Sequence, residues 1–292
     1  MNESYHLLPQ LERLLRRLDT ADTPLVQVWG WPGSGKTGLL QAFLERHGAC
    51  ASGLRLGDFS DDERLRDAME AATGARWLVV SGPPGERLAE AVRWLRPGQG
   101  LVFATEARWS GGIGSSLPCT VLAPQEMLLT PEEVAMLWHL YTGCVLDPGS
   151  VQALWQASDG WYRPLRLAID ATGGVDLEQA DARLLLEIPP VRFFLRHEVL
   201  DSFTVEERDL LLEMSGERPG PGAPGWDAVE ARGLWVEGEE RDRLPHLLAA
   251  LLDRERRRRP KTGPTPVSGV ERPAFALEAA VPRLVYRVGL LG

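Results

Sequence analysis

Apolar and polar residues alternate along the first 124 residues in a way that predicts strands and helices in turn. Short apolar runs typical of buried strands occur at residues 24–30, 52–56, 76–82, 100–106 and 119–122. Between them, and before the first, apolar positions recur every three or four residues, as on a helix face, at residues 7–18, 35–48, 61–74 and 86–95. This alternation predicts a parallel sheet flanked by helices, which is an α/β fold.

After Ala123 the pattern changes to helices alone. Thr130 and Glu133 form a capping box with Pro131 at the first helical position, and a second capping box pairs Thr204 with Glu207. Further helices are predicted at residues 151–160, at 164–174 and around the proline pair at 189–190. Residues 226–259 show the outline of helix, strand, acidic turn, strand or loop, and helix, which predicts a small winged-helix unit.

The composition argues against a membrane, secreted or DNA-binding protein. The 292 residues are 44% apolar and 25% charged, as in ordinary globular proteins, and have no apolar run of membrane-spanning length. Three distant cysteines and an N-terminus without a signal-peptide pattern favour a cytoplasmic protein. The formal net charge of -9 argues against direct DNA binding by this chain.

One sequence motif predicts a phosphate-binding loop. Residues 30–37 match G-x-x-x-x-G-K-[ST] and lie between a predicted strand and a predicted helix. We expect ATP or ADP phosphates to contact this loop, which consists of Gly30, Trp31, Pro32, Gly33, Ser34, Gly35, Lys36 and Thr37. Thr37 would also ligate Mg²⁺ bound to the nucleotide. The structural alternative is a glycine-rich strand–helix turn with a capping threonine, but lysine occurs only at positions 36 and 261, so a chance match is improbable.

The carboxylates that hydrolysis requires are not evident. A hydrolytic enzyme of this class needs an acid at the end of a neighbouring strand, and the candidate strand at residues 76–80 is followed by Ser81 and Gly82. Glu106, after the fourth strand, is the candidate catalytic residue, and Asp58, after the second, is another; either is alternatively an ordinary solvated carboxylate. The sequence therefore predicts nucleotide binding with weak or lost hydrolysis.

Four segments of the sequence resemble those of a known protein family. In order and spacing, "LTPEEVAMLW", "LWQASDGWYRPLRLA", "RHEVLDSFTVEERDLLLEMS" and "ARGLWVEGEERDRLPHLLAALL" resemble segments of the MalT-like, large LuxR-type transcriptional regulators. These regulators belong to the STAND class of P-loop NTPases, and the resemblance spans roughly residues 5–258. It implies a P-loop domain with a RecA/AAA-like sheet at residues 1–124, an all-α lid at 125–182 and a winged helix at 183–259. A proline-rich linker and a terminal strand then occupy residues 260–292.

The resemblance also implies a mechanism of signal transduction. In that family the ADP form is closed and inactive, whereas ATP with an inducer favours an open form that self-associates and drives transcription. A histidine of the winged helix contacts the ADP phosphates, and the matching position here is His246, which is alternatively a plain helix-face histidine.

Several positions depart from the family pattern. Ser81 and Gly82 replace an acidic pair, and Glu106 stands where the family usually has arginine. The family's repeat sensor and its helix-turn-helix are not found in these residues, and the ending resembles the opening strand of a winged-helix activator, so a fragment of a longer regulator is one expectation. Three hypotheses remain open: a STAND switch, an active ATPase that uses displaced acids such as Glu106, and an interaction scaffold that binds no nucleotide.

Overall fold

The computed structural model describes residues 10–59, 61–81, 86–109, 117–174, 177, 181–213, 226–236 and 243–258. Met1–Arg258 forms one compact unit, and the second unit, Arg259–Gly292, lies outside the described residues. The linker and terminal strand predicted at residues 260–292 therefore fall outside them as well.

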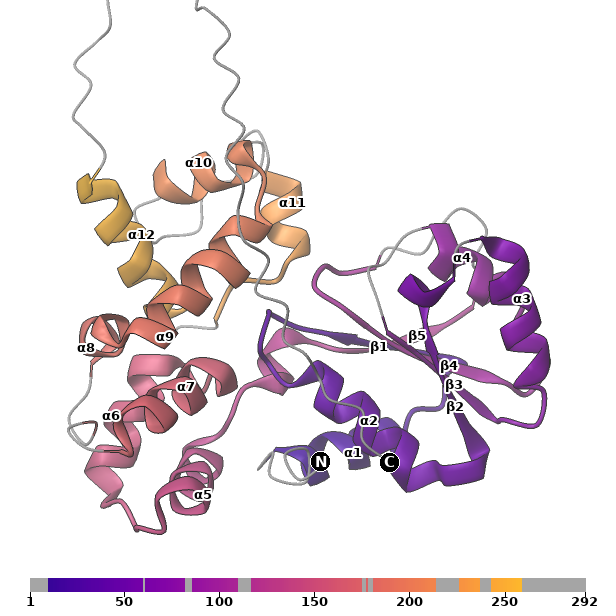
Figure 1. Cartoon of the computed structure of the whole chain (residues 1–292), viewed down its shortest axis with the longest axis horizontal. Helices are drawn as coiled ribbons and strands as arrows, with labels where there is room; N and C mark the ends of the chain where they lie inside the picture. Colours follow the sequence, from indigo (N-terminus) through magenta and orange to yellow (C-terminus); the bar gives the residue numbers. More distant parts are fainter. Residues whose placement is uncertain are drawn as a thin grey trace, which may run out of the picture. The chain divides into compact units, whose positions relative to one another are not determined.

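The sheet has the predicted parallel form (Figure 1). Its strands are β1 (Leu25–Trp29), β2 (Ala51–Arg55), β3 (Trp77–Ser81), β4 (Gly100–Thr105) and β5 (Cys119–Leu122), in the order β2-β3-β4-β1-β5. Every pairing is parallel. The central strands β3 and β4 read as nearly continuous apolar runs because both faces of the sheet are covered by helices.

Two pairs of helices cover the two faces of the sheet. Helices α1 (Leu11–Asp19) and α2 (Lys36–His47) pack on the face that carries Val26 and Val28. Helices α3 (Asp62–Ala71) and α4 (Glu86–Arg93) pack on the opposite face, against Leu78 and Val80. The strand–helix alternation predicted from periodicity is confirmed, although α1 begins at Leu11, and residues 7–9 of its predicted range lie outside the described ones.

The remainder of the compact unit is helical, as predicted. Its α-helices are α5 (Pro131–Thr142), α6 (Pro148–Ser158), α7 (Tyr162–Thr172), α8 (Ala182–Glu187), α9 (Pro189–Phe193), α10 (Val205–Glu213), α11 (Trp226–Ala231) and α12 (His246–Arg258). Both capping boxes form: the Thr130 amide donates to Glu133 Oε2 at 2.9 Å, and the Thr204 amide donates to Glu207 Oε2 at 2.8 Å. The stretch Phe194–Val199 after α9 is a π-helix, which the sequence pattern did not distinguish from ordinary helix.

A single hydrophobic core joins these helices. It contains residues from the predicted lid, such as Leu137 and Leu165, together with Leu211 and Leu248 from the predicted winged helix. Trp31, which belongs to the phosphate loop, is part of the same cluster. Residues on both sides of the boundary predicted between 182 and 183 therefore share one core. The division into lid and winged helix stays a prediction.

The winged-helix assignment is not confirmed. Within the described residues, the predicted hairpin is represented by one antiparallel bridge, in which the Val236 and Arg243 backbones exchange hydrogen bonds of 2.8 and 3.0 Å. The acidic turn expected between them lies at residues 237–242, outside the described ranges. None of the helices that the structure describes is long and apolar enough to cross a membrane.

Candidate functional site: the phosphate loop and its cavity

The segment between β1 and α2 has the backbone of a phosphate-binding loop. Gly33 and Gly35 adopt φ values of 69° and 97°, in the left-handed region that favours glycine. A Cβ atom at Gly33 would lie 2.5 Å from the Cβ of Arg163, so a larger residue also lacks space. Gly35 is the N-cap of α2, and the partial positive charge of that helix end therefore faces the loop.

Two carbonyl groups of the loop, those of Pro32 and Gly33, bond to the helical part of the chain. The indole Nε1 of Trp161 donates to the Pro32 carbonyl at 2.9 Å, and the Arg163 amide donates to the Gly33 carbonyl at 3.1 Å. In a planar trans peptide the N–H and C=O point in opposite directions. The outward Pro32 carbonyl thus turns the Gly33 amide toward the inner side of the loop, where an anion would bind.

Lys36 lies over the mouth of this loop. Its Nζ donates to the Gly30 carbonyl at 2.7 Å and to the Trp31 carbonyl at 2.8 Å. An ammonium has three donors, so one is left to meet a phosphate oxygen. Burial lowers the pKa of Lys36 to about 8, and the nearby Glu106 carboxylate opposes part of that shift. A bound phosphate would compensate this desolvation.

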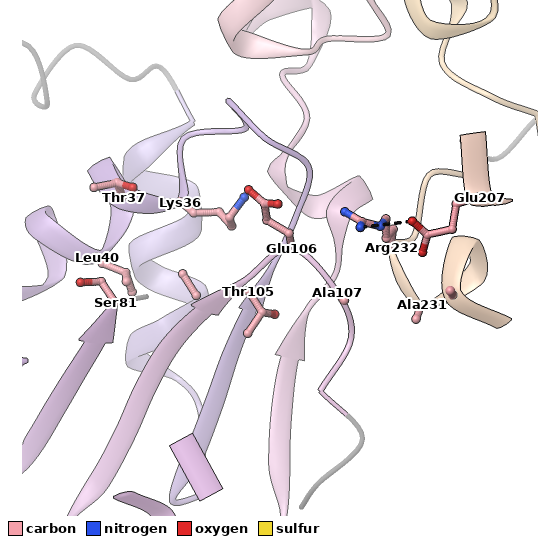
Figure 2. A pocket seen from close by; sticks show the side chains of 12 residues that line it. Lys36, Thr37, Leu40, Ser81, Thr105, Glu106, Ala107, Glu207, Ala231 and Arg232 are labelled. Carbon is pink, nitrogen blue, oxygen red and sulfur yellow. Dashed lines mark ion pairs between the residues drawn. The ribbon is translucent and has the colours of Figure 1, made fainter. Parts of the chain in front are cut away.

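A cavity of about 670 Å³ opens beside the loop, within the range typical of ligand pockets (Figure 2). It is lined by Lys36, Thr37, Leu40, Ser81, Ala104, Thr105, Glu106, Ala107, Glu207, Ala228, Ala231 and Arg232. Four residues that the sequence singled out therefore meet here: Lys36, Thr37, Ser81 and Glu106. Thr37 lines the cavity, and its role as an Mg²⁺ ligand stays a prediction. The described part of the chain contains no cluster of three or more acidic, histidine or cysteine side chains that could hold a metal.

The strand order explains which acid reaches the cavity. The sequence interpretation took β3 as the strand neighbouring the loop, but β4 lies between β1 and β3. Trp29 is in register with Thr105, and the Gly30 amide donates to the Thr105 carbonyl at 3.2 Å. Glu106 therefore stands directly beside the start of the loop. Asp58, at the end of a 3₁₀ turn after β2, is exposed and does not line the cavity.

Gln27 supports this arrangement and was missed in the sequence. It is fully buried in the middle of β1, and its Nε2 donates to Thr105 Oγ1 at 2.7 Å and to the Ala107 carbonyl at 3.2 Å. These bonds fix the end of β4 on both sides of Glu106. The available signal was one polar residue inside an apolar strand, since a buried amide needs partners.

A tryptophan ring at this position of the loop has two options, to flank a bound nucleotide or to cover the loop from outside, and Trp31 takes the second. The side chain is 1% exposed and is part of the helical core, with its ring centroid 5.1 Å from that of Trp161. Its Nε1 donates to the Gly233 carbonyl at 2.8 Å. The ring is thus turned away from the cavity, and only the backbone of Trp31, through its carbonyl, takes part in the loop.

His246 also lies in a setting that the sequence did not predict. The residue begins α12, and its Nδ1 lies 2.6 Å from the Gln156 carbonyl and 3.2 Å from Asp159 Oδ1. Asp159 Oδ2 also accepts the His246 amide at 2.6 Å, and the hydrogen bond with Asp159 is the main cause that raises the pKa of His246. In this conformation the histidine joins α12 to the end of α6 and does not line the cavity.

Comparison with known proteins identifies the fold of the chain but no family. No family model and no curated protein matches the chain. Among solved structures, a Walker-type ATPase of Pyrococcus abyssi matches with a TM-score of 0.52 at 12% identity, covering 84% of this chain and 94% of that one. The Holliday junction branch migration motor RuvB of Thermotoga maritima matches with a TM-score of 0.41 at 16% identity, covering 84% and 92%. The parallel sheet and the first of these likenesses show that the chain has the α/β fold of the P-loop NTPases.

Proposed function

We propose that this chain binds ATP or ADP with Mg²⁺ and acts as a STAND-type switch module of a transcriptional regulator, with weak or lost hydrolysis. One observation carries the proposal: Lys36 lies over a glycine loop at the start of α2, beside a cavity of about 670 Å³. Amides, an ammonium and a helix N-terminus converge there, which is the arrangement that a polyphosphate requires.

The contacts of the loop support a switch. Three consecutive loop residues bond to the helical part: Trp31 through its side chain, and Pro32 and Gly33 through their carbonyls. A phosphate that reshapes the loop on its inner side changes these outer contacts as well, since one short backbone segment carries both. A ligand shifts a conformational equilibrium only if it interacts differently with the two states, and this shared segment provides such a difference.

The charge pattern supports weak hydrolysis. Ser81 lines the cavity where an acid would hold the magnesium shell, and serine brings no charge. The LuxR-type regulatory role and self-association in the ATP state rest on the sequence resemblance alone. In this proposal Mg²⁺ neutralises phosphate charge, while Lys36 and Thr37 position the phosphate chain.

An active ATPase is the second candidate, and the position of Glu106 favours it. This carboxylate follows the strand that pairs with β1, lines the cavity and acts electrostatically on Lys36. A carboxylate at that place would orient an attacking water.

The test measures bound nucleotide after purification, ATP and ADP affinity with Mg²⁺, and turnover. The variants are Lys36→Ala and Glu106→Gln, and Asp58→Asn is the matched control because Asp58 is exposed and outside the cavity. Binding that is lost in Lys36→Ala, with turnover at background in every variant, supports the switch. Turnover that Glu106→Gln abolishes and Asp58→Asn preserves would favour the ATPase. Absence of binding by the wild type would overturn both in favour of an interaction scaffold.

A further inference from the structure

The wall of the cavity opposite the loop comes from α10, α11 and the residue that follows α11. It is formed by Glu207, Ala228, Ala231 and Arg232. Figure 2 shows the guanidinium of Arg232 directed toward the side of the cavity that holds Lys36 and Glu106. Two cations and two carboxylates therefore line the cavity, and each cation has a carboxylate on its own wall.

The Arg232 side chain is held in place by its neighbours. Its Nη2 donates to the Ser202 carbonyl at 2.9 Å, and its guanidinium carbon lies 4.4 Å from the centroid of the Phe203 ring. The backbone is anchored as well, since the Arg108 amide donates to the Ala231 carbonyl at 2.6 Å. Arg108 lies two residues after Glu106, so the backbone next to Arg232 is bonded to the segment that follows β4, beside the loop.

The ion pair between Arg232 and Glu207 is loose. Arg232 Nη2 lies 3.5 Å from Glu207 Oε2, which is longer than a charge-assisted hydrogen bond. The same Oε2 accepts the Thr204 amide at 2.8 Å, so this oxygen already serves the cap of α10. The side chain of Glu207 is 8% exposed, whereas that of Arg232 is 21% exposed, so the carboxylate is the more deeply buried partner. A guanidinium has five donors, more than its contacts with described residues engage.

Resting on the proposed nucleotide binding, we propose that Arg232 recognises the terminal phosphate of ATP, exchanging Glu207 for that phosphate, and so distinguishes ATP from ADP. Lys36 and the backbone amides suffice to bind the phosphates that lie inside the loop. A further phosphate extends past Lys36 and Thr37 into the cavity, where Arg232 supplies the positive charge of the opposite wall. A planar guanidinium binds phosphate through two parallel hydrogen bonds, which a carboxylate held at 3.5 Å does not match.

The charge at position 106 supports this assignment. Glu106 lines the same cavity and repels a terminal phosphate. Lys36 is the cation on the loop side, and Arg232 is the other cation among the residues that line the cavity. Without Arg232, the charged side chains that line the cavity would be two carboxylates and a single ammonium, so the extra phosphate would depend on Lys36 and the Mg²⁺ bound with it.

The test compares Kd values for ATP and ADP with Mg²⁺ in the wild type, Arg232→Ala, Arg232→Lys and Glu207→Gln. We expect Arg232→Ala to weaken ATP binding about tenfold or more and to change ADP binding less than about twofold, because only the terminal phosphate loses a charge-assisted pair. Arg232→Lys keeps a cation without the planar fork and should recover part of the loss. Glu207→Gln keeps an oxygen acceptor for the Thr204 amide and should tighten ATP binding selectively.

Arg208→Ala is the matched control. Arg208 lies in α10 next to Glu207 and, like Arg232, donates to a backbone carbonyl, that of Phe203, but it does not line the cavity. An equal loss of ATP and ADP affinity in Arg232→Ala, or an unchanged ratio in a folded Glu207→Gln, would overturn the inference while leaving nucleotide binding intact. Wild-type protein that binds neither nucleotide would overturn the proposed function, and this inference with it.

Discussion

Replacing Gly233 by alanine tests how the turn after α11 packs on the end of the sheet. Gly233 has φ of 61°, and a Cβ atom there would lie 2.4 Å from Cζ2 of Trp29 and 2.8 Å from Cγ of Pro124. Neither neighbour is the end of a flexible chain, so the backbone of the turn has to move. The Gly233 carbonyl accepts the Trp31 indole N–H, and that movement therefore reaches the phosphate loop.

Two costs add in Gly233→Ala. Holding alanine in the left-handed region costs about 1–2 kcal/mol. Forcing a methyl group into a packed site typically costs about 1–3 kcal/mol more. The total is about 2–5 kcal/mol in the free energy of unfolding, with the second part specific to the contact with Trp29 and Pro124.

Gly143→Ala separates the two costs. Gly143 has a similar φ of 72°, but a Cβ atom there would meet nothing within 4 Å. We expect it to show only the backbone cost of about 1–2 kcal/mol. At ~2–4 °C per kcal/mol for a protein of this size, the thermal midpoint of Gly233→Ala should lie about 2–12 °C below that of Gly143→Ala, as read by scanning calorimetry. Equal midpoints for the two variants would refute the packing of Gly233 against Trp29.

Three further outcomes follow from the site and from the contact between α6 and α12. Because the hydrogen bond with Asp159 raises the pKa of His246 above 6.5, protonation of His246 stabilises the fold below that pH, and the gain is lost as the pH rises through the raised pKa. Between about pH 6 and pH 8, the thermal midpoint of the wild type should fall further than that of His246→Gln; parallel curves would contradict this. Since the pKa of Lys36 is about 8, nucleotide affinity measured by titration calorimetry should fall as the pH rises through about 8, and a flat profile up to about pH 9 would count against the lysine contact. Thr37→Val should make ATP affinity nearly insensitive to Mg²⁺, whereas an unchanged response to Mg²⁺ would remove Thr37 from the metal site.

Local signals in the sequence predicted the elements well, for physical reasons. Strand β3 is an unbroken apolar run, which a sheet covered on both faces requires, and the start of α5 carries a complete capping box at Thr130 and Glu133. The phosphate loop was equally visible, because its glycines, lysine and threonine lie within eight consecutive residues. Each of these features depends on neighbours in the chain, so no tertiary information was needed to find it.

Pairings between distant segments were not visible in the sequence. Nothing local indicates that β4 inserts between β1 and β3, and that insertion brings Glu106, instead of the end of β3, next to the loop. Arg232 escaped notice for the same reason, since it is separated from Lys36 by almost 200 positions and the cavity alone brings them together. The sequence left open whether the Trp31 ring flanks a nucleotide or covers the loop from outside, because only packing in the helical core decides between the two.

The burial of Trp31 also constrains how the proposed switch works. Its ring completes the core that the helices share, while its carbonyl accepts a hydrogen bond from Lys36 at 2.8 Å. In the proposed switch, a phosphate that draws Lys36 away from this carbonyl would release one side of the residue and so change its other contact, the indole hydrogen bond to Gly233. In this proposal, nucleotide binding would act directly on a residue that packs in the helical core and bonds to the turn after α11.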